Sequence, residues 1–426
     1  MPGSSTMLSL FNNYRARRSR STSKSRGGCK AGATFLVIAP YYQRLREQAG
    51  ILRRQRVKSP TVTATRHSPT RIRSFEVEPL DIPLIEPFGI SSGVQVVARN
   101  VLVTVELADG TRGYGEAAPF APYNGETQAG ALRALRQAHD WLPGRNARTW
   151  RALAGEFFRR GGRNCGAAQC AFETAVLDAL KRHERVPLWR YFGGAGTTLE
   201  TDMTVTTGSP AEAAAAARAI VGRGIRAIKM KIGGRRGPAH DLARIAAVLE
   251  VSPKAPLILD GNAAFSRAGA RELAMGMKKL GIVPALLEQW LAKNDLDGAR
   301  ALAEETGWLV AADEGCCSAR DARRIARKRA AQVINIKFMK AGIVAALDIA
   351  RVARAHRLGL MIGGNIESIL AMTVSAHFAA GLGGFRFGDL DTPLFMAENP
   401  FRGGYKLKGA RISVAHIAAG HGVTPR

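Results

Sequence analysis

The sequence predicts an α/β fold: a (β/α)8-type (modified TIM) barrel with an α+β capping domain formed by N- and C-terminal segments. Two observations support this prediction. Over residues 199–388, eight short β-rich runs alternate with Ala-rich amphipathic helical segments. No Gly-x-Gly-x-x-Gly stands at a strand-to-helix turn, which argues against a dinucleotide-binding sheet. The 426 residues suffice for a barrel with an attached domain.

The first segment, residues 1–72, is rich in Arg and Ser and poor in acids. Residues 1–75 hold 16 Lys or Arg and one acid, so they supply more than half of the net charge of +28. A segment with so little apolar surface cannot offset the entropy of ordering, and we expect a disordered basic extension. A targeting segment, a start site placed too early and a nucleic-acid-binding arm are the alternatives.

The second segment, residues 73–198, has the pattern of the capping domain. Residues 75–82 and 96–107 alternate as antiparallel strands do, with a turn at Asp109-Gly110. The small residues between these runs, 87–93, predict a flexible lid loop. Helical periodicity follows over residues 127–142, 149–159 and 165–183.

The barrel pattern then covers residues 199–388, and residues 389–426 predict short strands that return to the capping domain. The expected barrel strands lie near residue 204 and over residues 227–232, 257–259, 286–287, 309–311, 333–336, 359–362 and 384–387. The expected helices cover residues 210–222, 240–250, 267–280, 295–306, 318–328 and 342–356.

Carboxylates follow three consecutive apolar runs of the predicted barrel. Asp260, Glu288 and Asp313 each stand where a strand ends. Because the carboxyl ends of barrel strands meet at one rim, we expect these side chains to lie close together. Three carboxylates suit a hard cation, so the sequence predicts one Mg²⁺ per subunit.

Lysines stand on both sides of this predicted metal site. Lys229 and Lys231 are two residues apart on one strand and therefore share a face, the barrel interior. Lys337 ends a later strand across the barrel. Neighbouring cations and desolvation lower a lysine pKa toward a useful range for proton abstraction. A carboxylate substrate held by Mg²⁺ between Lys231 and Lys337 could exchange its α-proton through an enediolate, which predicts racemisation or epimerisation.

With these motifs, residues 73–420 resemble the enolase superfamily, in the subgroup typified by muconate-lactonizing enzymes. The motifs are Lys229-Met-Lys231, Asp260-Gly-Asn262, Glu288-Gln289, Asp313-Glu314 and Asn335-Ile-Lys337-Phe-Met-Lys340. The resemblance implies that Asp260, Glu288 and Asp313 bind Mg²⁺ and that Lys231 and Lys337 are the opposed acid/base pair. It implies that Lys229 contacts the substrate carboxylate.

One further motif resembles that of the dipeptide epimerases in this subgroup. Asp389-Leu-Asp391 closes the eighth predicted strand, where the resemblance implies that both carboxylates hold the substrate's free α-ammonium. Thr204 matches a substrate-side threonine of the first strand. The lid residues 89–93 include no Arg or Lys, which disfavours a dipeptide with an acidic second residue. We therefore expect a Mg²⁺-dependent isomerase that inverts the C-terminal residue of an L,L-dipeptide.

Other functions remain open at this stage. N-acylamino-acid racemase, o-succinylbenzoate synthase and cycloisomerase activities share the two-lysine site, and the basic extension allows a nucleic-acid-binding protein from a different class. The five cysteines show no CxxC spacing, and no apolar run reaches the roughly 18 residues that span a bilayer. We expect a cytoplasmic homo-oligomer that binds a small molecule, with no specific nucleic-acid partner and no membrane partner.

Overall fold

A computed structural model defines residues 68–426 of the protein, and these residues form one compact unit. The predictions for the basic extension concern residues 1–72 and fall almost wholly outside the described residues. Within the described part of the chain, no helix is both long enough and apolar enough to cross a lipid bilayer.

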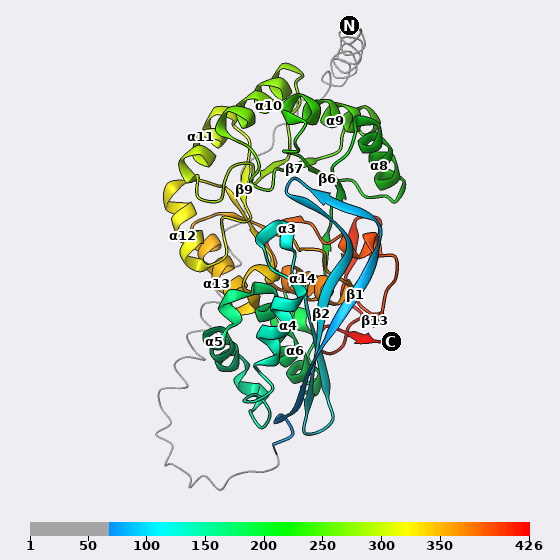
Figure 1. The fold of residues 1–426 in the computed structure, drawn as a ribbon, viewed down its shortest axis with the longest axis vertical. Helices are drawn as coiled ribbons and strands as arrows, with labels where there is room; N and C mark the ends of the chain where they lie inside the picture. Colours follow the sequence, from blue (N-terminus) through cyan, green and yellow to red (C-terminus); the bar gives the residue numbers. More distant parts are fainter. Residues whose placement is uncertain (1–67) are drawn as a thin grey trace, which may run out of the picture. The chain divides into compact units, whose positions relative to one another are not determined.

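The first part of the described chain is an antiparallel sheet of three strands, in the order β1-β2-β3, with helices beside it (Figure 1). The elements are β1 (Ile72–Ile90), β2 (Gly93–Leu107), β3 (Arg112–Ala117), α3 (Ala121–Asn124), α4 (Gln128–Arg136), α5 (Trp150–Arg160), α6 (Gly166–His183) and α7 (Leu188–Tyr191). Short 3-10 turns cover Ala147–Thr149 and Gly162–Asn164. Helices α4, α5 and α6 correspond to the three predicted ones, although α4 ends at Arg136 and not at residue 142. The predicted turn at Asp109-Gly110 joins β2 to β3.

The predicted lid loop over residues 87–93 is instead the tip of a long hairpin. Strands β1 and β2 pair from Ile72 opposite Leu107 to Ile90 opposite Gly93, with an irregularity between Pro83 and Phe88. The tip turns through two residues only. Cross-strand pairing therefore continues through a stretch whose small residues suggested a loop.

Sheet and helix approach each other closely where β3 crosses α6. A Cβ atom added at Gly115 would lie 2.1 Å from the carbonyl oxygen of Ala171, and one added at Gly113 would lie 2.1 Å from the amide nitrogen of Ala179. Only glycine fits at this distance, so these two positions set the contact between the sheet and the most buried helix of this region.

The second part is an eight-stranded parallel sheet with the strand order β12-β11-β10-β9-β8-β7-β6-β5. Its strands are β5 (Met203–Val205), β6 (Ile228–Lys231), β7 (Leu257–Asp260), β8 (Leu286–Glu288), β9 (Val310–Ala312), β10 (Val333–Ile336), β11 (Gly359–Ile362) and β12 (Phe385–Gly388). The two end strands meet where the Asp202 amide, next to β5, donates to the Gly388 carbonyl at 2.8 Å. All eight predicted strands are present.

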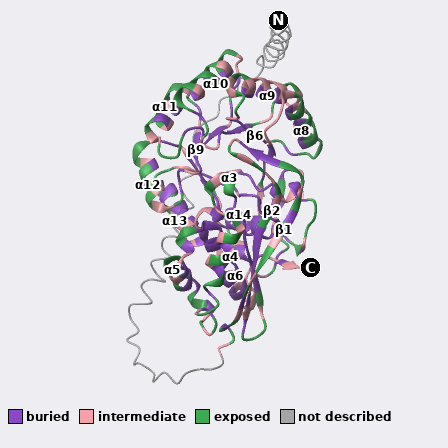
Figure 2. Cartoon of the chain, in the orientation of Figure 1, coloured by how far each residue is buried: buried purple, intermediate pink, exposed green. Residues whose placement is uncertain are grey.

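The connecting helices are α8 (Pro210–Gly222), α9 (Gly237–Val251), α10 (Arg267–Lys279), α11 (Leu296–Thr306), α12 (Ala319–Lys328), α13 (Gly342–Ala355) and α14 (Ile369–Leu382). Helices α8 to α13 form an arc outside the strands (Figure 1), and their outward faces are exposed (Figure 2). Side-chain caps fix several helix starts, such as Ser209 with Glu212 in a capping box and Ser266 and Ser318 on the amides three residues on.

Inward-facing apolar residues fill the lower barrel. Ile258, Leu286, Ala311, Val333 and Met361, one from each of five adjacent strands from β7 to β11, form one buried cluster. This layer lies below the strand ends, so the polar residues that close the strands stand on a packed apolar base.

The last strands connect the two parts of the described chain. They are β13 (Phe401–Gly403), β14 (Lys406–Lys408), β15 (Arg411–Ser413) and β16 (Val423–Pro425), and 3-10 turns cover Phe338–Lys340 and Thr392–Phe395. Strand β15 pairs with β4 (Thr198–Glu200), just before the barrel begins. A second buried cluster of Leu102, Leu370, Phe401 and Val423 joins β2, α14 and the last strands.

Candidate active site

The polar residues predicted at strand ends do meet at the carboxyl rim of the barrel. Lys231, Asp260 and Glu288 are the last residues of β6, β7 and β8 and stand side by side in register. Asp313 directly follows β9, and Lys337 directly follows β10. Because the strands are parallel, consecutive ends present these side chains to one enclosed volume.

Lys229 is the centre of an ion-pair network in this volume. Its Nζ lies 2.6 Å from Asp389 Oδ2, 2.9 Å from Glu288 Oε2 and 3.1 Å from Asp260 Oδ2, and the side chain is fully buried. Lys231 pairs with Asp260 at 2.6 Å. Lys229 therefore contacts both the metal-ligand candidates and the Asp389 motif, and these ion pairs between lysines and strand-end carboxylates are a finding of the structure.

Across the barrel, Asp313 has two lysine partners. Lys337 Nζ lies 2.7 Å from its Oδ2, and Lys340 Nζ donates to its Oδ1 at 2.9 Å and to its carbonyl oxygen at 2.7 Å. The Tyr123 hydroxyl donates to Oδ1 at 3.2 Å, and Lys337 Nζ stands 4.7 Å from the centre of the Tyr123 ring. Asp313 is thus contacted by two lysines of the barrel and by Tyr123 of α3.

These contacts decide how the buried groups titrate. Burial disfavours the ionised form of Asp260, but Lys231 and Lys229 outweigh it and hold the pKa at about 2. Burial likewise disfavours the charged form of Lys337, yet Asp313 outweighs it and raises the pKa above its ordinary value. The pKa of Lys229 is also raised, chiefly by Asp389 against the effect of burial. For Lys229 and Lys337 the expected lowering of the pKa is therefore wrong, because paired carboxylates outweigh desolvation.

The donor set fits a divalent cation. Glu288 Oε2 and Asp313 Oδ2 each have a lysine at ion-pair distance but no hydrogen bond, while Asn335 Nδ2 donates to Glu288 Oε1 at 2.7 Å and fixes its carboxylate. Buried carboxylates outnumber the lysines in this volume, so a divalent cation such as Mg²⁺ would be stabilised there. The carboxylates are Asp202, Asp260, Glu288, Asp313, Asp389 and Asp391, with Glu314 next to Asp313 and in contact with Asn262, and the lysines are Lys229, Lys231, Lys337 and Lys340.

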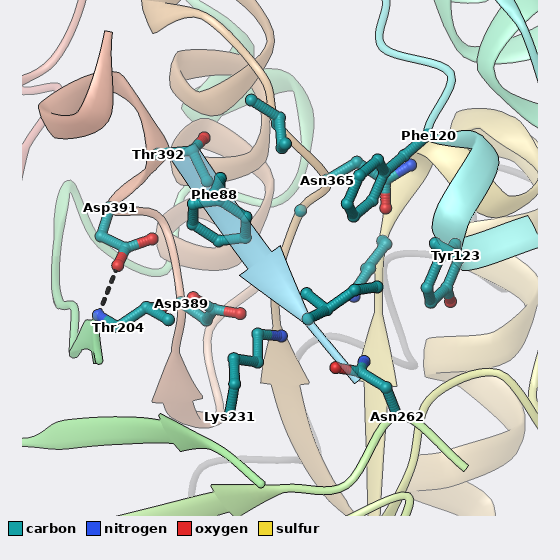
Figure 3. A pocket seen from close by; sticks show the side chains of 14 residues that line it. Phe88, Phe120, Tyr123, Thr204, Lys231, Asn262, Asn365, Asp389, Asp391 and Thr392 are labelled. Carbon is teal, nitrogen blue, oxygen red and sulfur yellow. Dashed lines mark hydrogen bonds between the residues drawn. The ribbon is translucent and has the colours of Figure 1, made fainter. Parts of the chain in front are cut away.

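The Asp389-Leu-Asp391 motif follows β12 and lies beside β5. Asp391 Oδ2 accepts the Thr204 amide at 2.7 Å (Figure 3). Burial, followed by the charge of Asp389, raises the pKa of Asp391 to about 7. Thr204 contributes its backbone to this contact, and its side chain lines the pocket together with both aspartates.

A pocket over the rim brings the predicted residues together with others from the hairpin and α3 (Figure 3). Thr204, Lys231, Lys337, Asp389 and Asp391 line it. Its remaining walls are mostly apolar or amide side chains, from Phe88, Ile90, Phe120, Tyr123, Asn262, Asn365, Ile366 and Thr392. None of the residues that line it from the hairpin is basic, in line with the expectation from the lid sequence.

The hairpin tip touches the barrel loops directly. The Ser91 hydroxyl donates to the Gly261 carbonyl at 3.4 Å, and the Thr207 amide donates to the Gly89 carbonyl at 3.4 Å. A Cβ atom added at Gly89 would lie 2.4 Å from Thr207 Oγ1. The tip therefore closes over the loops that follow β5 and β7.

The sequence interpretation missed four contributors to this site. Tyr123 comes from the capping part, which no strand-end pattern could single out. Lys340 and Asn335 stood inside a quoted motif without a role, although both contact metal-ligand candidates. The fourth contributor is Asp202. Its spacing of two residues from Thr204 places both on the same face, and this spacing was the signal available in the sequence.

Two family models and a named relative match most of the chain. The family model "Mandelate racemase / muconate lactonizing enzyme, N-terminal domain" matches residues 74–193, and "Enolase C-terminal domain-like" matches residues 211–426. An aromatic dipeptide epimerase of Herpetosiphon aurantiacus is 49% identical over 355 residues, which cover 83% of this chain and 99% of that protein.

Solved structures agree with these matches. A mandelate racemase/muconate lactonizing enzyme from Roseiflexus is 56% identical with a TM-score of 0.80, covering 84% of this chain and 99% of that one. A dipeptide epimerase from Enterococcus faecalis, complexed with Mg and the dipeptide L-Leu-L-Tyr, is 29% identical with a TM-score of 0.77, covering 83% and 99%.

Proposed function

Because the chain belongs to the mandelate racemase/muconate lactonizing enzyme family of the enolase superfamily, we propose that it is a Mg²⁺-dependent dipeptide epimerase. It inverts the α-carbon of the C-terminal residue of a dipeptide by a 1,1-proton transfer. The relatives named as dipeptide epimerases support this class of reaction.

The observation that most strongly supports the proposal is the placement of two lysines across one pocket. Lys231 ends β6 and Lys337 follows β10, four strands apart in a sheet of eight, and both line the same cavity. A carbon held between them presents opposite faces to the two amines. One lysine removes the α-proton and the other delivers a proton to the opposite face, so the configuration inverts.

Other residues of the chain bind and orient the substrate in this proposal. Asp260, Glu288 and Asp313 would hold Mg²⁺, which supplies Lewis-acid stabilisation of the negative charge that develops on the substrate carboxylate. Asp389 and Asp391 accept hydrogen bonds from the α-ammonium at the other end of the dipeptide. The hairpin tip covers the pocket and excludes water from the exchanging proton.

The residues that line the pocket indicate which second side chain of the dipeptide it would accept. Phe88, Ile90, Phe120 and Ile366 provide apolar contact, and a charged residue from the hairpin is absent among the described lining residues. The H. aurantiacus relative is named for aromatic dipeptides. We therefore propose a dipeptide whose second side chain is neutral and apolar or aromatic.

A library of dipeptides incubated with the enzyme and Mg²⁺ in D₂O tests this function. Each turnover should add one mass unit at the α-carbon of the C-terminal residue, and apolar second residues should exchange fastest. If no member of the library gains mass, the proposed function is wrong.

The alternative activities of the family are separated by one substitution. N-acylamino-acid racemisation, o-succinylbenzoate synthesis and cycloisomerisation involve no free ammonium, so Asp391→Asn should leave them nearly intact. Epimerisation of a free dipeptide should fall at least about 100-fold in kcat/KM, because a buried charge partner of the ammonium is lost.

A further inference from the structure

Asp202 is a buried carboxylate that the mechanism above does not use. Its side chain precedes Thr204 by two residues, so it shares the inward face of the barrel one layer below. Only 2% of the residue is exposed, and neither carboxylate oxygen has a hydrogen-bond partner. Burying an ionised carboxylate without a partner is costly, so a cationic ligand at this position would stabilise the charged form of Asp202.

The two nearest acids are those of the Asp389-Leu-Asp391 motif. One oxygen from each of Asp202, Asp389 and Asp391 lies within 4.8 Å of the other two. For any such triangle there is a point no more than about 2.8 Å from all three oxygens, which matches the length of a hydrogen bond from a charged nitrogen to a carboxylate. The second oxygen of Asp391, Oδ1, also has no partner.

Lys229 does not fill this point. Its Nζ contacts Asp389 at 2.6 Å, but among residues 68–426 it forms no ion pair within 4.0 Å of Asp202 or Asp391. The three carboxylates therefore surround a position for one more cation. Asp389 and Asp391 line the substrate pocket. Asp202 lines a separate hollow with Arg226, Pro256 and Ala285 at the other end of the strands, but its carboxylate oxygens are enclosed. The position between the three carboxylates therefore adjoins the substrate pocket through Asp389 and Asp391.

We infer that Asp202 is the third carboxylate of the subsite for the substrate's α-ammonium. A primary ammonium has three N–H donors, one for each carboxylate. This inference rests on the proposed dipeptide epimerase function and adds a specificity: the subsite accepts a primary amine and discriminates against an alkylated or absent one. Asp202 acts as a binding residue, with no part in proton transfer.

Three probes test the subsite: L-Ala-L-Phe, N-methyl-L-Ala-L-Phe, which has one N–H donor fewer, and propionyl-L-Phe, which lacks the amine. Deuterium incorporation is measured for the wild type and for Asp202→Asn. We expect the variant to lose at least about tenfold in kcat/KM toward L-Ala-L-Phe. The loss should be under about threefold for the N-methyl probe and absent for propionyl-L-Phe.

An equal loss for all three probes would overturn the inference, because a structural role of Asp202 affects every substrate alike. An equal loss for the two amine probes, with none for propionyl-L-Phe, would also overturn it, because a long-range charge effect weakens the binding of any ammonium. An equal loss for all three probes is also expected if a water molecule or an inorganic cation, and not the substrate's ammonium, occupies the position between the three carboxylates. Wild-type enzyme that exchanges no dipeptide at all would instead contradict the proposed function, and the subsite with it.

Thermal stability gives an independent readout. Asp202→Asn keeps the shape and removes one of three mutually repelling carboxylates, so the Tm without substrate should stay the same or rise. The matched control is Asp241→Asn, another buried aspartate, which accepts the Gly233 amide at 2.8 Å and pairs with Arg244 at 3.3 Å. Its Tm should fall. A fall of equal size for Asp202→Asn would assign Asp202 a structural role and refute the subsite.

Discussion

Replacing Lys231 with Ala should separate proton exchange from epimerisation. If Lys231 and Lys337 serve opposite faces of the α-carbon, the variant retains only Lys337 as a base. It should still exchange the α-proton of one epimer with D₂O, and exchange of the other epimer should fall by about 10²–10⁴, the usual contribution of a general base. Interconversion of the epimers needs both lysines and should fall by the same factor.

The structure indicates that Lys231→Ala lowers the free energy of unfolding only moderately. Asp260 loses Lys231 at 2.6 Å but keeps Lys229 at 3.1 Å, so its buried charge is not left without a partner. The free energy of unfolding should therefore fall by less than the about 3–5 kcal/mol that breaking a buried pair outright costs. Thermal unfolding checks this, and Lys279→Ala, at the exposed end of α10, is the control that should change neither exchange nor Tm.

Proton NMR in D₂O on each purified epimer gives the two exchange rates separately. Lys337→Ala should show the opposite preference from Lys231→Ala. The two-face arrangement is refuted if both variants lose exchange with the same epimer, or if Lys231→Ala interconverts the epimers within tenfold of the wild-type rate.

Three more predictions concern stability and the metal. Burial lowers the pKa of His377 to about 3, so the folded state requires the neutral imidazole. The free energy of unfolding should therefore decrease as pH falls below the unfolded pKa near 6.5, by about 2 kcal/mol at pH 5. In urea titrations, His377→Asn should flatten this dependence on pH, and an unchanged dependence would contradict the prediction. Gly115→Ala should lower the free energy of unfolding, measured with denaturant, by at least about 2 kcal/mol, because the new Cβ would meet Ala171. The control Gly222→Ala, whose Cβ would have nothing within 4 Å, should be neutral or stabilise by up to about 1 kcal/mol. Similar values for both variants would refute the close-packing argument. EDTA should abolish exchange and excess Mg²⁺ restore it, with Mg²⁺ at 100 times its Kd stabilising the fold by about 2.7 kcal/mol; activity that persists in EDTA would rule out the metal site.

Strand ends were the part of the site that the sequence could predict. Asp260, Glu288 and Lys337 each follow an apolar run, and a parallel barrel brings such ends together whatever the loops do. Helices with one apolar face were equally recognisable. Helix α14 was not, because it is buried on nearly all sides and has no amphipathic stripe.

Contacts between distant segments could not be predicted in the same way. Tyr123 reaches Asp313 from 190 residues away in the sequence, and its position depends on how the capping part packs on the barrel. The lid was predicted as a loop because small residues suggest flexibility, although pairing with Gly93 continues the strand to Ile90. The spacing to Thr204 places Asp202 on the inward face, but its closeness to Asp389 and Asp391 depends on the meeting of β5 with β12, which no local pattern encodes.

The meeting of the barrel's two end strands also bears on the order of events during synthesis. The Thr201 amide donates to the carbonyl of Ala410 and the Asp202 amide to that of Gly388, both at close to 3 Å. The first barrel strand pairs on one side with β6, which follows it soon in the sequence, but its other side finds its partners only after about 200 further residues have left the ribosome. Until then it has an unpaired edge, and such edges are prone to aggregate. We expect the ring, and with it the ammonium subsite, to form only after residue 410 has been synthesised, in a slow, non-local folding step.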